Sequence, residues 1–232
     1  MLQHAKLSAS GASRWLACPP SVRLEENFPN KSTSYTEEGT LAHEMGEYQV
    51  QYILGMTDLQ ECLDHLETLE KHKYFTAEMK EHTEAYAEYI AERYKAIKEQ
   101  CKDAFVEIEK RVDFSKWVRE GFGTCDCCII ADDTLEIIDF KYGKGHKVDA
   151  ENNAQMQLYA LGAIEAYSML YDIKKVKMTI FQPRLASISV AEISVEELLQ
   201  WAEEYVKPRA ILGYSGKGEF APREETWTLC NS

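Results

Sequence analysis

A predicted β-hairpin in the middle of the chain constrains the fold more than any other feature of the sequence. Residues 127–131 and 135–140 are two apolar runs of strand length, and the polar tripeptide 132–134 separates them. Two such runs joined by a short polar segment are typical of adjacent antiparallel strands. We therefore expect this pair of strands to lie at the centre of a sheet, with the rest of the chain arranged around it.

Charged residues border this hairpin at the end where its first strand begins and its second strand stops. Asp126 begins the first strand, and Asp139 and Lys141 end the second on one face, because they are two residues apart. Two carboxylates and an ammonium group are costly to bury unless they bind something. Carboxylate oxygens suit Mg²⁺ or Mn²⁺. The alternative is an exposed aspartate–lysine ion pair, which is common at strand ends.

Four short motifs follow one another along the chain. They are G-x-x-x-H at residues 39–43, G-x-x-D at 123–126, D-x-K at 139–141 and Q-x-x-x-Y at 155–159. In this order and at these distances they resemble the motifs of the RecB-like branch of the PD-(D/E)XK nucleases, which includes phage and CRISPR-associated exonucleases. Four ordered motifs are much more specific than any one of them.

The resemblance implies an α/β fold with a restriction-endonuclease-like core, in which helices flank a mixed central sheet. It implies one nuclease domain over residues 1–232, mainly helical over 1–103, with the sheet core and a C-terminal helix over 104–232. Apolar periodicity predicts where the elements lie. The expected helices are 37–54, 58–70, 76–102, 149–171 and one that starts after a Ser194 cap and ends at 207; the expected strands are 104–114, 127–131, 135–140, 174–182 (parallel to 135–140) and 188–193.

The activity that the resemblance implies is that of a Mg²⁺- or Mn²⁺-dependent deoxyribonuclease. Such an enzyme, an exonuclease in most relatives of this type, would hydrolyse phosphodiester bonds in phage-type DNA recombination or processing. The metal ligands would be His43, Asp126, Asp139 and the backbone carbonyl of Phe140. Lys141 would position the attacking water or help to activate it.

Further residues are expected to contact the DNA. By the same resemblance, Gln155 and Tyr159 arrange the substrate strand and the lysine, although Tyr159 is equally compatible with a place in the core. Lys144 and Lys147 belong to a short segment that is rich in lysine and free of acids, which suits contacts with phosphates. Arg184 follows a predicted strand and is a further candidate for a phosphate contact.

The first predicted strand carries two glutamates that remain open alternatives for the site. Residues 104–114 alternate between apolar and polar, which places Glu107 and Glu109 on one face together with Phe105. In the nucleases that this chain resembles, an acidic residue of this strand can join the site. The sequence favours neither glutamate over the other.

The cysteines argue against an iron–sulfur cluster. Their number, seven, is odd, and their irregular spacing does not fit a disulfide framework. Some of the nucleases that the chain resembles bind a cluster through a cysteine in the place of Cys18 and three cysteines near the C-terminus, where this sequence has only Cys230. A sequence truncated at its C-terminus would likewise leave Cys18 without the other three cluster ligands. We expect Cys18 to be a core residue, and the C-x-C-C of residues 125–128 is poorly spaced for zinc.

Charge and hydropathy limit the class of protein. The net charge of -13 excludes a surface that coats nucleic acid generally, but leaves room for a local basic site at residues 141–147. No apolar run is long enough for a membrane span, and the N-terminus has no signal core. We therefore expect an intracellular protein without a membrane span; the resemblance to the nucleases implies the bacterial cytoplasm, single- or double-stranded DNA as the substrate and a phage recombination protein as a partner.

Two other classes of function remain as alternatives. The first is a nuclease fold without activity that binds DNA or another protein, although the complete set of motifs argues against this. The second is a redox or zinc protein that uses the seven cysteines. Exo- or endonuclease action, polarity, one or two metals and oligomeric state have no signal in the sequence.

Overall fold

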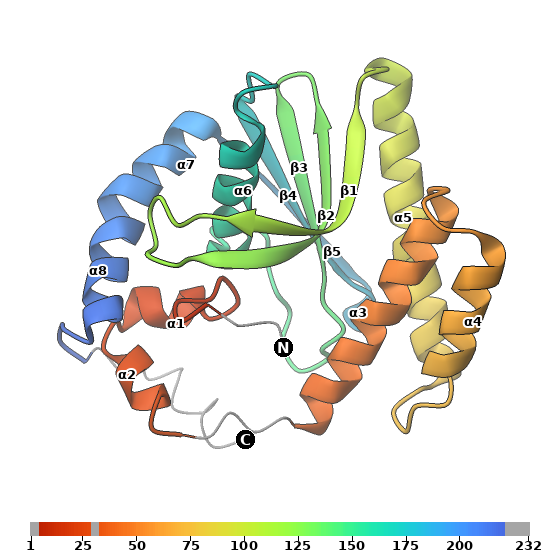
Figure 1. The fold of residues 1–232 in the computed structure, drawn as a ribbon, viewed down its shortest axis with the longest axis horizontal. Coiled ribbons are helices and arrows are strands. Elements are labelled where there is room, and N and C mark those ends of the chain that lie inside the picture. Colours follow the sequence, from red (N-terminus) through yellow and green to blue (C-terminus); the bar gives the residue numbers. More distant parts are fainter. Residues whose placement is uncertain (1–4, 29–32, 221–232) are drawn as a thin grey trace.

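The computed structural model describes residues 5–28 and 33–220, and within these ranges five strands form one mixed sheet with helices on both faces (Figure 1). The predicted α/β class with a helical N-terminal part is confirmed. The strands are β1 (Phe105–Asp113), β2 (Phe122–Ala131), β3 (Thr134–Phe140), β4 (Lys175–Gln182) and β5 (Ser187–Ser194). The helices are α1 (Ala12–Ala17), α2 (Ser21–Glu25), α3 (Ser34–Ile53), α4 (Leu59–Leu69), α5 (Ala77–Gln100), α6 (Ala154–Tyr167), α7 (Val195–Trp201) and α8 (Lys207–Ser215).

The strands lie side by side in chain order from β1 to β5. Neighbouring strands are antiparallel except β3 and β4, which are parallel. The predicted hairpin is the β2–β3 pair, and its ladder runs from Ala131–Thr134 to Cys127–Ile138. Helix α6 connects β3 to β4, so it provides the crossover that a parallel pair requires.

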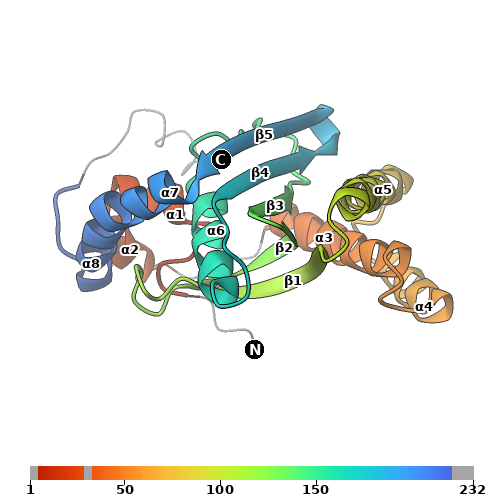
Figure 2. The same ribbon diagram turned by 90° about the horizontal axis from the view of Figure 1, so that it is seen from above.

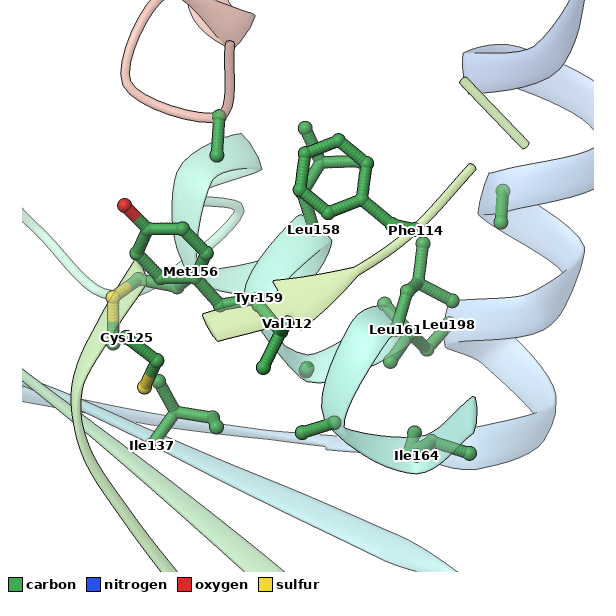
Figure 3. Close-up of a cluster of buried hydrophobic side chains, with 14 of the residues drawn as sticks. Val112, Phe114, Cys125, Ile137, Met156, Leu158, Tyr159, Leu161, Ile164 and Leu198 are labelled. Atoms are coloured by element: carbon green, nitrogen blue, oxygen red, sulfur yellow. The ribbon is translucent and has the colours of Figure 1, made fainter. Parts of the chain in front are cut away.

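The helices form two layers, one on each face of the sheet (Figures 1 and 2). Helices α3, α4 and α5 cover one face, here called the α3 face, and α6, α7, α8, α1 and α2 cover the other, here called the α6 face. Each layer has its own apolar cluster, to which successive residues of β3 contribute alternately: Ile137 on the α6 face and Ile138 on the α3 face. Tyr159 lies at the margin of the α6-face cluster with its hydroxyl group pointing away from Leu161 and Ile164 (Figure 3).

The longer helices begin at side chains that cap them. Thr33, Asp58, Thr76, Asn153 and Ser194 each accept a hydrogen bond from the backbone N–H three residues later, which satisfies a donor that the first turn leaves free. At Ser194 the predicted cap is confirmed, and Glu197 completes a capping box. Among the described helices, none combines the length and the apolar character that crossing a bilayer requires.

Two predicted helices have wrong boundaries. The helix expected over 149–171 is shorter, because Asn153 caps it and Asn152 adopts a left-handed backbone (φ 54°), so α6 starts at Ala154 and ends at Tyr167. The last helix does not end at residue 207. It continues through a π turn (Ala202–Val206) into α8, in which Pro208 is the second residue.

Candidate metal centre

The candidate site lies where β2 and β3 separate. The ladder between these strands stops at the pair Cys127–Ile138, so Asp126 and Asp139 are the first residues beyond it. The backbone N–H of Phe140 donates a hydrogen bond of 2.8 Å to Asp126 Oδ2. The Asp126 carboxylate thereby accepts a hydrogen bond from the backbone of β3. It lies in the gap that opens between β2 and β3 beyond the pair Cys127–Ile138, here called the fork.

An irregular backbone step in β1 and another in β2 turn the carboxylates of Glu109 and Asp126 toward the α3 face. On β1, Val106 and Ile108 pack on the α3 face, whereas Lys110 lies beside Tyr167 of α6, so Glu109 remains on the α3 face after Ile108. Glu109 has a left-handed backbone (φ 50°), which interrupts the alternation of the strand. The predicted common face of Glu107 and Glu109 is therefore wrong.

A matching step occurs on β2. Cys125 and Cys128 belong to the α6-face cluster and Cys127 to the α3-face cluster, so Asp126 and Cys127 turn to the same side although they are consecutive. The β1–β2 pairing holds on both sides of this step and skips the opposite residues Glu109 and Asp126. The two carboxylates face each other at the break in the ladder.

His43 joins these carboxylates from α3. Its Nδ1 lies 3.4 Å from Asp126 Oδ2, and its ring packs edge-on against Phe140, with centroids 5.3 Å apart. One ligand atom from each of His43, Glu109 and Asp126 lies within 4.8 Å of the other two. The three residues come from one helix and two strands and form a half-buried group that could hold a metal ion.

The donor set fits a small divalent cation. Ligand atoms about 2.1 Å from a common octahedral ion lie about 3–4 Å apart, so the group would have to contract in order to close on Mg²⁺ or Mn²⁺. Two carboxylates suit either ion, and the imidazole favours the softer Mn²⁺. Asp139 Oδ2 is buried beside the group and pairs with Lys141 Nζ at 2.9 Å.

The electrostatics of the group show a deficit of positive charge. Burial, followed by the charges of Asp126, Glu47 and Asp139, raises the pKa of Glu109 from 4.5 to about 8. Burial also raises the pKa of Asp126 from 3.8 to about 6; the charges of His43 and Lys141 oppose this rise and that of Asp139 adds to it. A bound cation would favour the ionised form of both carboxylates and so lower both pKa values.

Asp139 is held on the α6 face by a network that includes Lys141, Gln155 and Tyr159. Gln155 Nε2 donates to Asp139 Oδ1 at 3.2 Å and to the Tyr159 hydroxyl at 3.0 Å, and Gln155 Oε1 accepts from Lys141 Nζ at 3.0 Å. Burial lowers the pKa of Lys141, but the charges of Asp139 and Asp126 outweigh it and raise that pKa overall. The structure thus brings the D-x-K and Q-x-x-x-Y residues together.

Tyr159 reaches this network because a glycine lies against its ring. A Cβ placed on Gly123 would be 2.7 Å from Tyr159 Cε1 and 3.6 Å from the Cβ of Ala9, so β2, α6 and the N-terminal segment meet at this point. Burial raises the pKa of Tyr159, which keeps the phenol protonated. The first residue of the G-x-x-D motif therefore has a steric role.

The residues expected to contact phosphates have different surroundings. Lys144 and Lys147 are exposed on the loop between β3 and α6, and Lys147 Nζ lies 3.2 Å from Asp149 Oδ1. Arg184 is mostly buried, and its guanidinium group pairs with Glu38 of α3 at 3.0 Å. Arg184 thus joins the end of β4 to the helix that carries His43.

The described cysteines are free thiols. Cys18 is half-buried rather than a fully buried core residue, and Cys230 lies outside the described residues. Among residues 5–28 and 33–220, the group with metal-ligand geometry contains no cysteine. The group that could hold a metal ion therefore offers nitrogen and oxygen ligands.

Sequence reasoning left Glu109 as an open alternative and placed Asp139 in the ligand group, whereas the group within 4.8 Å contains Glu109. One signal was available: three charged residues in succession, 109–111, interrupt the alternation of the first strand. The Phe140 carbonyl remains a predicted ligand, since the recorded contact of this residue with Asp126 is through its N–H.

Comparison with known proteins gives a family but no activity. A solved structure described as "Crystal structure of SSO0001" is 13% identical, with a TM-score of 0.26 over 84% of each chain, and this similarity is too low to support an argument. The family model described as "Protein of unknown function (DUF2800)" matches residues 4–232. The match covers nearly the whole chain, and the protein belongs to this family.

Proposed function

We propose that this protein is a metal-dependent deoxyribonuclease of the RecB-like PD-(D/E)XK type, acting as an exonuclease in phage-type DNA recombination or processing. The observation that carries the proposal is the group of His43, Glu109 and Asp126, whose ligand atoms lie within 4.8 Å of one another. This group lies beside the charges of Asp139 and Lys141, both of which act on Asp126. A cation site next to a fixed ammonium group suits a phosphodiester substrate.

The chain's residues supply binding and orientation around that cation. A bound Mg²⁺ or Mn²⁺ would polarise the scissile phosphate and make a water molecule more acidic. His43, Glu109 and Asp126 would hold the ion, and the Phe140 N–H keeps one oxygen of Asp126 directed into the fork. Because three different elements supply these side chains, the site depends on the packing of α3 against the sheet.

Lys141 is suited to stabilise negative charge on the phosphate. Asp139 and Asp126 favour its protonated form, and Gln155 fixes its Nζ from the side of α6. An ammonium group held in this way can donate a hydrogen bond to a phosphate oxygen as negative charge develops there. Gln155 in turn is fixed by the Tyr159 hydroxyl, so the last motif orients the lysine.

A cleavage assay tests the proposal. End-labelled linear and circular DNA, single- and double-stranded, is incubated with the purified protein in Mn²⁺, Mg²⁺ or EDTA. We expect loss of linear DNA only with a divalent cation, and resistance of circular DNA if the enzyme is an exonuclease. Asp126→Asn and Lys141→Met should abolish cleavage. Asp172→Asn and Lys175→Met, at exposed ion pairs away from the site, should retain it.

The outcomes separate the proposal from its alternatives. DNA that binds but is not cleaved in either cation would favour an inactive nuclease fold that serves as a binding module. Cleavage that survives Asp126→Asn would remove the proposed site. A protein that contains stoichiometric zinc or iron after this substitution would favour cysteine chemistry instead.

A further inference from the structure

A buried glutamine at the end of β4 holds the basic loop that follows β3. Gln182 is 1% exposed, and its side chain makes three hydrogen bonds to the backbone of this loop. Its Nε2 donates to the carbonyls of Gly143 at 2.7 Å and His146 at 2.8 Å, and its Oε1 accepts from the N–H of Val148 at 3.0 Å. The amide group thus directs both of its donors and its acceptor oxygen to one loop.

The two carbonyls that Gln182 holds belong to the residues just before the two exposed lysines. Gly143 precedes Lys144, and His146 precedes Lys147, so the glutamine fixes the peptide unit at the start of each lysine. Both lysines are exposed whereas Gln182 is buried, and Lys147 Nζ lies 3.2 Å from Asp149 Oδ1 in an exposed ion pair.

The same strand end also anchors the catalytic lysine. The carbonyl of Phe181, next to Gln182, accepts a hydrogen bond of 2.9 Å from the backbone N–H of Lys141. A second anchor lies on β5, where Ser189 Oγ accepts from the Ala150 N–H at 2.9 Å. The loop is therefore fixed at its start, middle and end relative to Lys141, although the residues between are exposed.

We infer that Gln182 is a positioning residue that presents Lys144 and Lys147 to the phosphates of the substrate strand; this inference rests on the proposed function. A glycine-containing loop would sample many conformations, and ordering it on binding would weaken the affinity for DNA. A buried amide that fixes two peptide units removes this cost before the substrate arrives. The loop then acts as a preformed basic edge beside Lys141 in a protein with a net charge of -13.

Gln182→Glu is the most informative substitution. It keeps the shape and the acceptor for the Val148 N–H, but replaces two donors with an oxygen that repels two carbonyls. Gln182→Met is a second variant of similar size that introduces no charge. Gln200→Glu is the matched control, because Gln200 is an exposed glutamine on α7 that bonds only to Glu204 among the described residues.

Three measurements test the inference. Trypsin should cleave after Lys144 and Lys147 faster in both Gln182 variants than in wild type or Gln200→Glu. Affinity for DNA, measured in an Asp126→Asn background, should fall about tenfold, with a shallower salt dependence. KM for cleavage should rise by a similar factor while kcat changes by less than about twofold, because the metal group is not in contact with the loop anchor.

A double-mutant cycle distinguishes positioning from general damage to the fold. In a Lys144→Met, Lys147→Met background, Gln182→Glu should cause little further loss of DNA affinity, since it acts through those lysines. Affinity and trypsin cleavage that remain at wild-type values would overturn the inference alone. Full additivity in the cycle would also overturn it. Failure of the wild-type protein to bind DNA would overturn the proposed function, and this inference with it.

Discussion

Glu109 and Asp126 face each other at a break in the β1–β2 ladder, and both turn toward α3 because each strand takes one irregular step at this point. The step places Glu109 in a left-handed backbone conformation, which costs a non-glycine residue roughly 1–3 kcal/mol. A regular ladder would have turned both carboxylates to the α6 face, away from His43. The irregular backbone conformation at Glu109 therefore helps to bring the candidate metal ligands together.

Removal of the Glu109 carboxylate should weaken metal binding. Glu109→Gln keeps the size of the side chain but removes an anionic ligand, so the affinity for Mn²⁺ should fall by at least about tenfold in a calorimetric titration. Glu107→Gln is the control, because Glu107 lies on the opposite face and pairs with Lys110 at 2.9 Å. Equal affinities for wild type and Glu109→Gln would show that Glu109 is not a ligand.

The stability of the metal-free protein should depend on pH through the same carboxylates. The folded-state pKa values of Glu109 and Asp126, about 8 and about 6, lie above the ordinary values of 4.5 and 3.8. The folded state therefore keeps protons that the unfolded state has released. Their contribution to the free energy of unfolding is complete below about pH 4 and is lost as the pH rises through about 8.

Thermal melts in EDTA check this sign. The melting temperature of Glu109→Gln relative to wild type should increase between about pH 5 and about pH 8, because the glutamine does not ionise. In saturating Mn²⁺ at the higher pH, wild type should instead have the higher melting temperature of the two proteins. A difference between them that does not change with pH would contradict the raised pKa of Glu109.

Gly123→Ala should impair catalysis without loss of metal. The new Cβ would lie 2.7 Å from Tyr159 Cε1, so the ring must move and its 3.0 Å hydrogen bond with Gln155 must lengthen. Lys141 then loses its orientation, and the cleavage rate should fall about tenfold or more. Gly39→Ala is the control; no atom lies within 4 Å of its added Cβ, and it should stabilise α3 by roughly 0.5–1 kcal/mol.

Glu136 should be important for stability rather than for catalysis. It is 2% exposed at the opposite end of β3, where it pairs with Arg93 at 2.6 Å and Lys177 at 3.4 Å. Glu136→Gln leaves two cations without their partner and should destabilise the fold by about 3 kcal/mol, the low end for buried pairs because Arg93 is partly exposed. Urea denaturation measures this change; Glu67→Gln, at an exposed pair, should have little effect.

The sequence predicted those parts of the fold that follow from periodic patterns. The apolar runs of β2 and β3, the long apolar stripes of α3 and α5 and the Ser194 cap all appear where local rules place them. The hairpin pattern placed Asp126 near Lys141, and the resemblance to the nuclease motifs added His43; the structure brings these residues together.

Other features depend on contacts that no local pattern contains. The turn of Glu109 toward α3 requires an irregular backbone step that propensities do not predict. The sequence predicts a phosphate contact for Arg184, but its partner in the structure is Glu38, which is 146 residues away in the chain. Helix α6 starts later than the pattern predicts because residues 149–153, of which all but Ala150 are polar, extend the loop that Gln182 and Ser189 anchor.

The fork between β2 and β3 has a consequence for how this fold can change. The Phe140 N–H that orients Asp126 is the donor that a further backbone hydrogen bond between β2 and β3 would use. Substitutions that regularise these strands would therefore strengthen the sheet and close the fork at the same time. Thermostable variants selected only for resistance to heat should therefore tend to lose the geometry of the candidate metal group, so stabilising substitutions are better placed elsewhere in the structure.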